Sequence, residues 1–502
     1  MTDVSARIDP SAEIAPIDRR IFGGFVEHLG RHIYDGIFEP GHASAGADGF
    51  RSDVVDLVRE LGVSTIRYPG GNFVSGYRWE DGIGPVAERP RRLDLAWHAT
   101  ETNRIGLHEF QDWLDKVGSE LMLAVNLGTR GTQEALDLLE YANTSVKTAR
   151  TDERAANGRA EPFGVTVWCL GNEMDGPWQL GHRNAEDYGK LASRTAKGMR
   201  QLDPSIELVV CGSSGRTMPT FGAWEREVLE HTFDDVDFIS CHAYYQEHDG
   251  DAQEFLASAV DMQKFIDEVV DTADHVAAVR KSDKRIMLSF DEWNVWYMSK
   301  WEELAVTYGP DEWPVAPRQL EDQYNALDAV VFGDLLITLL QHADRVRSAS
   351  LAQLVNVIAP IMTEPGGIAW RQTTFFPFSI TSRLAGERAV RVPVDSGTFT
   401  SARFGDVANV NAVATIDHEG VSLFVVNRSL TDAAALSIDV SSLGRDLAVC
   451  ESHLLHDDDL YAANTLDDPE RVGVRPVDGA AVAASVLTAS LPPVSWAAFR
   501  LA

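Results

Sequence analysis

The 502-residue sequence predicts an α/β fold: a parallel (β/α)8 TIM barrel followed by a C-terminal all-β sandwich domain. The barrel prediction depends on short apolar runs that alternate with helical patterns from about residue 20 to residue 355. These runs are mostly unbroken, as expected for strands that are buried on both faces. From about residue 377, short segments of alternating polarity are separated by Gly, Asp, Ser and Pro, which is typical of a sandwich.

Eight apolar runs supply the strands of the predicted barrel. Amphipathic helices lie between the runs, for example where Leu191 and Met199 belong to one apolar stripe. Asn184, three residues before Asp187, predicts the start of that helix. In chain order the runs begin at Ile21, Ser64, Leu121, Val165, Ile206, Phe238, Arg285 and Ser348. The expected domains are residues 1–16, an N-terminal strand that joins the sandwich, 17–376, the catalytic barrel, and 377–502, the sandwich.

Composition and charge exclude several classes of protein. The chain has 44 Lys and Arg against 76 Asp and Glu, and the formal charge of −32 argues against nucleic acid or an anionic membrane as a partner. We find no secretion signal and no run of about 18 apolar residues, so we expect a cytoplasmic protein without a membrane partner. The four cysteines form no CxxC pair, and neither a zinc-ligand spacing nor a phosphate-binding loop occurs. We therefore expect no metal and no cofactor.

Two glutamates stand at the ends of predicted barrel strands, where the functional groups of parallel barrels gather. Glu173 follows Asn172 after the fourth run, and Glu292 precedes Trp293 at the end of the seventh. Cleavage of a glycoside needs two such carboxyl groups, a protonated one for the leaving oxygen and an ionised one for the sugar carbon. The pair therefore predicts a glycosidase whose two acids only the fold can bring together.

Other strand ends and loops supply candidate substrate-binding residues. The loop tryptophans are candidates because an indole face can stack on a sugar ring while its N–H remains a donor. The candidates at strand ends are Glu27, Asn72, Phe73, Asn172, His242, Tyr244 and Gln353, and those in loops are Trp97, Trp178 and Trp296.

Five blocks between Ile21 and Tyr297 are long enough to be distinctive. In chain order they read IFGGFVEHLGRHIYDGI, TIRYPGGNFVSGYRWEDGIGP, CLGNEMDGPWQLGH, CHAYY and FDEWNVWY. These blocks resemble the α-L-arabinofuranosidases of glycoside hydrolase family 51, and the β-rich tail is similar in character to that family's C-terminal sandwich. The resemblance implies retaining, exo-acting hydrolysis of terminal non-reducing α-L-arabinofuranosyl groups. The substrate would be arabinan, arabinoxylan or an oligosaccharide derived from them, and the protein would be a homo-oligomer, often a hexamer.

The resemblance also implies roles for individual residues. Glu173 of the Gly-Asn-Glu motif would be the general acid/base and Glu292 of the Asp-Glu-Trp motif the nucleophile, with their carboxyl groups about 5 Å apart. Tyr244 would lie beside the nucleophile, and Phe73 stands where some relatives carry Cys. The residues implied to contact the furanose are Glu27, Asn72, Asn172 and Gln353.

Two other functions remain compatible with part of these observations. A retaining endo-acting β-glucanase or xylanase would use the same barrel and acid pair, but with an open cleft in place of a closed pocket. The loops that carry Trp97, Trp178 and Trp296 would decide between the two shapes. A sugar-binding protein without catalysis would have lost one of the two acids, and this sequence retains both.

Overall fold

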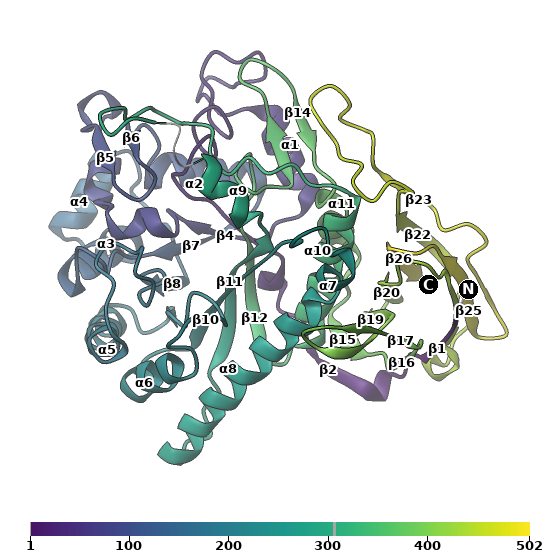
Figure 1. Ribbon diagram of the computed structural model, residues 1–502. Helices are drawn as coiled ribbons and strands as arrows, with labels where there is room; N and C mark the ends of the chain where they lie inside the picture. The colour runs from purple at the N-terminus through teal and green to yellow at the C-terminus, as the bar shows by residue number, and fades with distance from the viewer. Residues whose placement is uncertain (1, 305–307) are drawn as a thin grey trace.

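A closed barrel of eight parallel strands, with the helices around it, forms the larger of two domains (Figure 1). The structure, a computed structural model, describes residues 2–304 and 308–502. Each strand pairs in parallel with its two neighbours, and each coincides with one of the eight predicted apolar runs, so the predicted barrel is confirmed. Around the barrel the strands are β3 (Gly23–Phe25), β4 (Thr65–Tyr68), β7 (Glu120–Ala124), β8 (Val167–Leu170), β9 (Glu207–Val210), β10 (Phe238–Tyr245), β11 (Met287–Val295) and β12 (Val346–Leu351).

Helices surround the barrel and bury their apolar faces against it. The predicted start of α5 is confirmed, because the Asn184 side chain accepts a hydrogen bond from the backbone N–H of Asp187. Helix α10 is buried over almost its whole length because it packs between the barrel and the C-terminal β domain. The helices are α1 (Ser52–Leu61), α2 (Leu107–Val117), α3 (Thr132–Asn143), α4 (Ala149–Ala156), α5 (Ala185–Leu202), α6 (Ala223–Thr232), α7 (Ala252–Phe255), α8 (Ser258–Arg280), α9 (Met298–Leu304), α10 (Ala326–Gln341) and α11 (Phe375–Leu384).

The C-terminal domain is all-β, as predicted, and consists mainly of two sheets that enclose a separate apolar core. One sheet has the order β2-β15-β19-β20-β26-β22-β23 and the other β16-β1-β21-β25-β24. The strands of the first sheet are β2 (Glu13–Pro16), β15 (Arg388–Arg391), β19 (Val410–Ile416), β20 (Val421–Asn427), β26 (Ser495–Leu501), β22 (Val449–Leu455) and β23 (Val474–Arg475). Those of the second are β16 (Val394–Asp395), β1 (Thr2–Arg7), β21 (Ala434–Asp439), β25 (Val486–Leu491) and β24 (Ala481–Ala483).

Both ends of the chain lie in this domain (Figure 1). Strand β1 pairs in parallel with β21, and β2 pairs antiparallel with β15. Three short hairpins extend from the two domains: β5 (Arg92–Asp94) with β6 (Ala99–Glu101), β13 (Ile361–Thr363) with β14 (Ala369–Arg371), and β17 (Thr398–Ser401) with β18 (Gly405–Ala408). Within residues 2–304 and 308–502, we find no helix that combines the length and the apolar character needed to cross a bilayer.

Candidate active site

A cavity of about 490 Å³ opens at the C-terminal ends of the barrel strands. Such a volume lies within the usual range of small-molecule sites. Residues that directly follow β4, β8, β9 and β12 line the cavity, together with the last residues of β10 and β11. Of the residues predicted to bind substrate or to catalyse, the cavity is lined by Glu27, Asn72, Trp97, Glu173, Trp178, His242, Tyr244, Glu292, Trp296 and Gln353.

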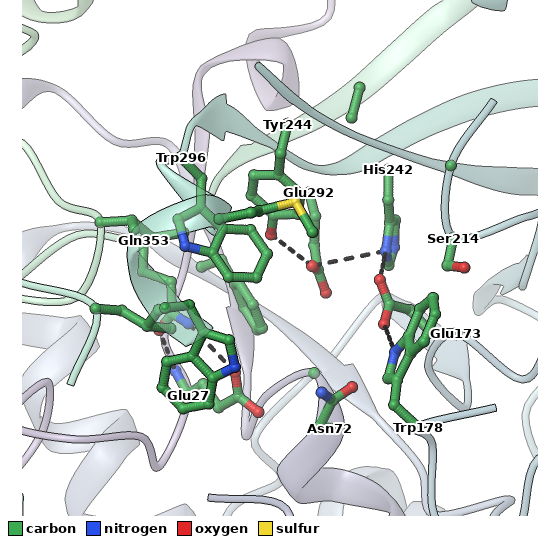
Figure 2. A pocket seen from close by; sticks show the side chains of 18 of the residues that line it. Glu27, Asn72, Glu173, Trp178, Ser214, His242, Tyr244, Glu292, Trp296 and Gln353 are labelled. Carbon is green, nitrogen blue, oxygen red and sulfur yellow. Dashed lines mark hydrogen bonds and ion pairs between the residues drawn. The ribbon is translucent and has the colours of Figure 1, made fainter. Parts of the chain in front are cut away.

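The two predicted catalytic glutamates converge on His242, as Figure 2 shows. His242 Nδ1 lies 2.9 Å from Glu173 Oε1 and 3.6 Å from Glu292 Oε2. One side-chain atom from each of the three residues lies within 4.8 Å of the other two. Strands β10 and β11 place His242 directly beside Glu292 in register, after an irregularity between Ser240 and His242. The fold therefore brings both carboxyl groups to one point of the cavity.

The backbone of Glu173 has an unusual conformation. Its φ angle is +43°, in the left-handed region that residues other than glycine seldom adopt. This strain turns the chain directly after β8 and directs the side chain toward His242 and Trp178. The indole Nε1 of Trp178 donates to Glu173 Oε2 at 2.7 Å. Strained backbone of this kind is concentrated at functional sites.

Glu292 is held by two strong donors. Arg67 Nη1 donates to its Oε1 at 2.8 Å, and the Tyr244 hydroxyl donates to its Oε2 at 2.7 Å. Both donors favour an ionised carboxylate, which accepts at each oxygen. Burial nevertheless raises the pKa of Glu292, and Glu173 adds to the rise, while His242, Arg67 and Tyr244 oppose it. We infer that these donors hold Glu292 as a carboxylate whose pKa remains above that of an exposed glutamate.

His242 lies among three carboxyl groups, those of Glu173, Asp291 and Glu292. Its Nε2 lies 3.0 Å from Asp291 Oδ1, so both ring nitrogens face carboxyl oxygens, and the proton between Nδ1 and Glu173 Oε1 can belong to either residue. Burial alone would lower the pKa of His242, but Glu292, Asp291 and Glu173 together raise it well above its usual value.

A second group of polar residues surrounds Glu27, the predicted furanose contact at the end of the first strand. The backbone N–H of Phe73 and the indole Nε1 of Trp97 both donate to Glu27 Oε1 at 2.9 Å. Gln353 Nε2 donates to Glu27 Oε2 at 3.2 Å. Burial raises the pKa of Glu27 to about 8, despite these donors. Glu27 therefore takes up a proton at higher pH than an exposed glutamate does.

Two other predicted contacts lie behind the lining of the cavity. The Phe73 ring is buried and stacks on His28, with ring centroids 4.6 Å apart, so only the backbone of Phe73 reaches a lining residue. Asn172 is buried as well; its Oδ1 accepts from Arg67 at 2.6 Å, and its Nδ2 donates to Asn72 Oδ1 at 3.4 Å. Asn172 thus connects the guanidinium beside Glu292 to Asn72, which lines the cavity.

The three predicted tryptophans all lie at the cavity, but in different ways. Trp178 is 54% exposed and donates to Glu173, while Trp97 is half-buried and donates to Glu27. Trp296 packs edge-on against Tyr244, and its buried indole N–H has no partner among the residues that the structure describes. Trp301, on α9, packs edge-on against Trp97 at 5.9 Å and completes this side of the lining.

Several residues of the site have no role that the sequence alone could assign. Arg67 and Asp291 stand at predicted strand ends, but their contacts with Glu292 and His242 depend on strands that are distant in the chain. The loop between β9 and α6 contributes five consecutive residues to the lining, from Ser214 to Met218. No motif or periodic pattern marks this loop as part of a site.

Comparison with known proteins agrees with the geometry. The model of the α-L-arabinofuranosidase 1 domain matches residues 57–268, and that of the α-L-arabinofuranosidase C-terminal domain matches residues 291–495. An exo-α-(1→6)-L-arabinofuranosidase of Bifidobacterium longum is 59% identical, over 98% of this chain and 96% of its own length. An intracellular exo-α-(1→5)-L-arabinofuranosidase of Streptomyces lividans is 57% identical, over 99% of this chain and 75% of its own.

Solved structures lead to the same family. A family 51 α-L-arabinofuranosidase of Bifidobacterium longum superposes with a TM-score of 0.95 at 49% identity and covers both chains completely. An α-L-arabinofuranosidase of Thermotoga maritima, solved with arabinose, gives a TM-score of 0.87 at 32% identity, again over both complete chains. The chain therefore belongs to glycoside hydrolase family 51, the family of these α-L-arabinofuranosidases.

Proposed function

We propose that the protein is an exo-acting α-L-arabinofuranosidase that removes terminal non-reducing α-L-arabinofuranosyl groups with retention of configuration. Its substrate would be arabinan, arabinoxylan or an oligosaccharide derived from them. The observation that carries the proposal is the convergence of Glu173 and Glu292, with one side-chain atom of each within 4.8 Å of the other. Retaining glycosidases hold their carboxyl groups about 5–5.5 Å apart, whereas inverting enzymes need roughly 6.5–9.5 Å to admit a water. The spacing favours retention.

In the first step, Glu292 attacks the anomeric carbon as the bond from that carbon to the leaving oxygen breaks. Glu173 gives its proton to the leaving oxygen, so the leaving group departs as a neutral alcohol. Arg67 and Tyr244 each donate a hydrogen bond to one oxygen of Glu292. These bonds orient the carboxylate and stabilise its charge until the new bond forms. The product of this step is an arabinofuranosyl ester of Glu292.

In the second step, Glu173 acts as a base. Glu173 has given up its proton in the first step, so its carboxylate can take a proton from water. The water oxygen attacks the anomeric carbon, and the ester bond to Glu292 breaks. His242 and Trp178 hold Glu173 in the same position for both steps, through contacts of 2.9 Å and 2.7 Å.

The furanose ring would bind between Glu292 and the group around Glu27. Glu27, Gln353 and Asn72 present polar atoms to this part of the cavity (Figure 2). A protonated Glu27 can donate to one sugar hydroxyl through its own hydroxyl and accept from another. Trp296 lines the same cavity and offers its ring to the sugar.

The shape of the cavity supports exo action over the endo alternative. The β5–β6 hairpin and the segment after β11 meet beside the cavity, where Thr100 N donates to Pro314 O at 2.8 Å and Gln319 Nε2 donates to Trp97 O at 3.1 Å. These contacts close one side, whereas an endo enzyme needs a cleft open at both ends to pass a chain. The high-identity relatives are likewise named as exo-acting enzymes.

The relatives and the family also support proposals about the location and the assembly of the protein. The relatives from Streptomyces lividans and Bacillus subtilis are named intracellular, which supports a cytoplasmic enzyme that acts on imported oligosaccharides. The family resemblance supports a homo-oligomer, often a hexamer. Light scattering of the purified protein would measure its mass in solution, and a monomer would contradict this part of the proposal.

A panel of aryl glycosides tests the function. The aryl α-L-arabinofuranoside should be cleaved far faster than the β-xyloside, the β-glucoside or the corresponding β-linked oligosaccharides. NMR of the first sugar released should show the α-anomer before mutarotation. Preferential cleavage of internal bonds in a glucan or xylan, or release of the β-anomer, would contradict the proposal.

A further inference from the structure

The cavity continues beyond the acid pair on the side of Glu173. Figure 2 shows Ser214 and Trp178 on the far side of Glu173 from Glu27 and Gln353. The loop between β9 and α6 forms this wall with five consecutive residues, from Ser214 to Met218. The cavity therefore has two ends, and the acid pair lies between them.

The positions of the nucleophile and the leaving group indicate what binds at the second end of the cavity. The nucleophile and the leaving group occupy opposite faces of the anomeric carbon, and the general acid must reach the leaving oxygen. With Glu292 and the Glu27 group around the furanose, the leaving group passes Glu173 and lies against the β9–α6 loop. This assignment rests on the proposed function.

Arg216 is the charged residue that the β9–α6 loop brings to the cavity. Its Nε and Nη2 donate to the two oxygens of Glu268 at 2.8 and 2.7 Å, and its Nη1 donates to Asp261 Oδ1 at 2.9 Å. These bonds use three of the five guanidinium N–H groups. The remaining two, one on each terminal nitrogen, have no partner among the described residues, and the side chain is 28% exposed.

The surroundings of Arg216 hold it rigidly. Glu268 and Asp261 both belong to α8, and Asp261 also faces Arg403 of the β17–β18 hairpin at 3.4 Å. The loop itself is tied to the strand end that carries the acid, because Ser214 N donates to Asp175 at 3.1 Å. A donor that is already ordered loses little conformational freedom when a ligand binds.

We propose that Arg216 recognises hydroxyl groups of a sugar in the leaving-group position, and so selects oligosaccharides over arabinofuranosides with apolar leaving groups. Arg216 lines this cavity end together with Ser214, Thr217 and Met218 of the same loop and with Trp178, and two of its N–H groups have no partner among the described residues. A guanidinium donates strong, directional hydrogen bonds to oxygen acceptors, and an indole face covers the apolar side of a sugar ring. Arg216 is thus a specificity-determining residue that takes no part in bond cleavage.

The test compares two substrates that share the arabinofuranosyl group. In α-L-arabinofuranosyl-(1→5)-L-arabinose the leaving group carries several hydroxyls, whereas in phenyl α-L-arabinofuranoside it carries none. Arg216→Met should lower kcat/KM for the disaccharide about tenfold, mainly through KM, and leave that for the phenyl glycoside within about twofold. An equal loss on both substrates, or no loss on either, would overturn the proposal.

Two further variants complete the design. Arg150→Met is the matched control, because Arg150 is 27% exposed, also pairs with two carboxylates, Asp137 and Glu153, and lies outside the cavity lining. Arg150→Met should leave kcat/KM for both substrates unchanged. Arg216→Lys keeps a positive charge between Asp261 and Glu268 and replaces the Met variant if that fails to fold; it should show the same selective loss on the disaccharide. If the unaltered protein cleaves neither arabinofuranoside, the proposed function itself is wrong, which is a different outcome from unselective loss.

Discussion

Removal of the Tyr244 hydroxyl tests what keeps Glu292, the proposed nucleophile, ionised. The hydroxyl donates to Glu292 Oε2 at 2.7 Å. A hydrogen bond to a charged group contributes roughly 1.5–3 kcal/mol, and one pKa unit corresponds to about 1.36 kcal/mol. Tyr244→Phe should therefore raise the pKa of Glu292 by about one to two units. Activity requires the carboxylate, so it is present above this pKa and lost as the pH falls through it. The acidic limb of kcat/KM should move to higher pH by the same amount.

The assay is the pH dependence of kcat/KM for an aryl α-L-arabinofuranoside, which reports ionisations of the free enzyme. Tyr461→Phe is a matched control, since Tyr461 donates to Glu247 at 2.8 Å and lies outside the cavity lining. It should leave the profile unchanged. An acidic limb of Tyr244→Phe that coincides with that of the unaltered enzyme would refute the view that Tyr244 stabilises the ionised nucleophile.

Other substitutions test the remaining roles. Glu292→Ala should abolish turnover of an aryl arabinofuranoside. Glu173→Ala should slow the second step, and azide should partly restore its activity when the leaving group is good. If azide restores no activity, the two roles are misassigned. In Glu27→Gln, a neutral amide takes the place of a carboxyl group whose pKa is raised to about 8. At neutral pH this variant should therefore retain more kcat/KM than Glu27→Ala. Equal losses would contradict a protonated Glu27. In Arg428→Met, the buried Asp334 of α10 loses the guanidinium that joins the β domain to this helix. Denaturant unfolding should show that the free energy of unfolding falls by about 3–5 kcal/mol. An unchanged free energy of unfolding would contradict the importance of this ion pair. Turnover should survive incubation with EDTA, and a large loss would show that the chemistry needs a metal.

Much of the barrel was predictable because its strands are buried on both faces. The run that begins at Phe238 is almost entirely apolar over its first half, and β10 begins at that residue. Asn184 was predictable as a helix start because its side chain satisfies a backbone N–H that no residue of the helix can reach. The β5–β6 hairpin, which supplies Trp97 to the cavity, is short and carries no periodic pattern, so its position could not be predicted.

The site was predictable only in part. Glu173 and Glu292 could be found because strand ends are marked in the sequence, and their motifs resemble a known family. Arg67 lies 225 residues from Glu292 in the chain, and only the closed barrel brings the two together. Phe73 was expected at the sugar, but its backbone N–H supports Glu27 while its ring packs elsewhere. Because every residue except proline has a backbone N–H, the type of residue at position 73 could not indicate this role.

The central claim is that Glu292 forms a covalent bond to the sugar while Glu173 supplies and removes the proton. Mass spectrometry of Glu173→Ala, after brief reaction with an aryl α-L-arabinofuranoside that has a good leaving group, tests it most directly. The variant should gain the mass of one pentosyl unit, and the label should lie on the peptide that contains Glu292. A label on another residue, or no labelled enzyme while the aryl alcohol is released in a burst, would contradict the claim.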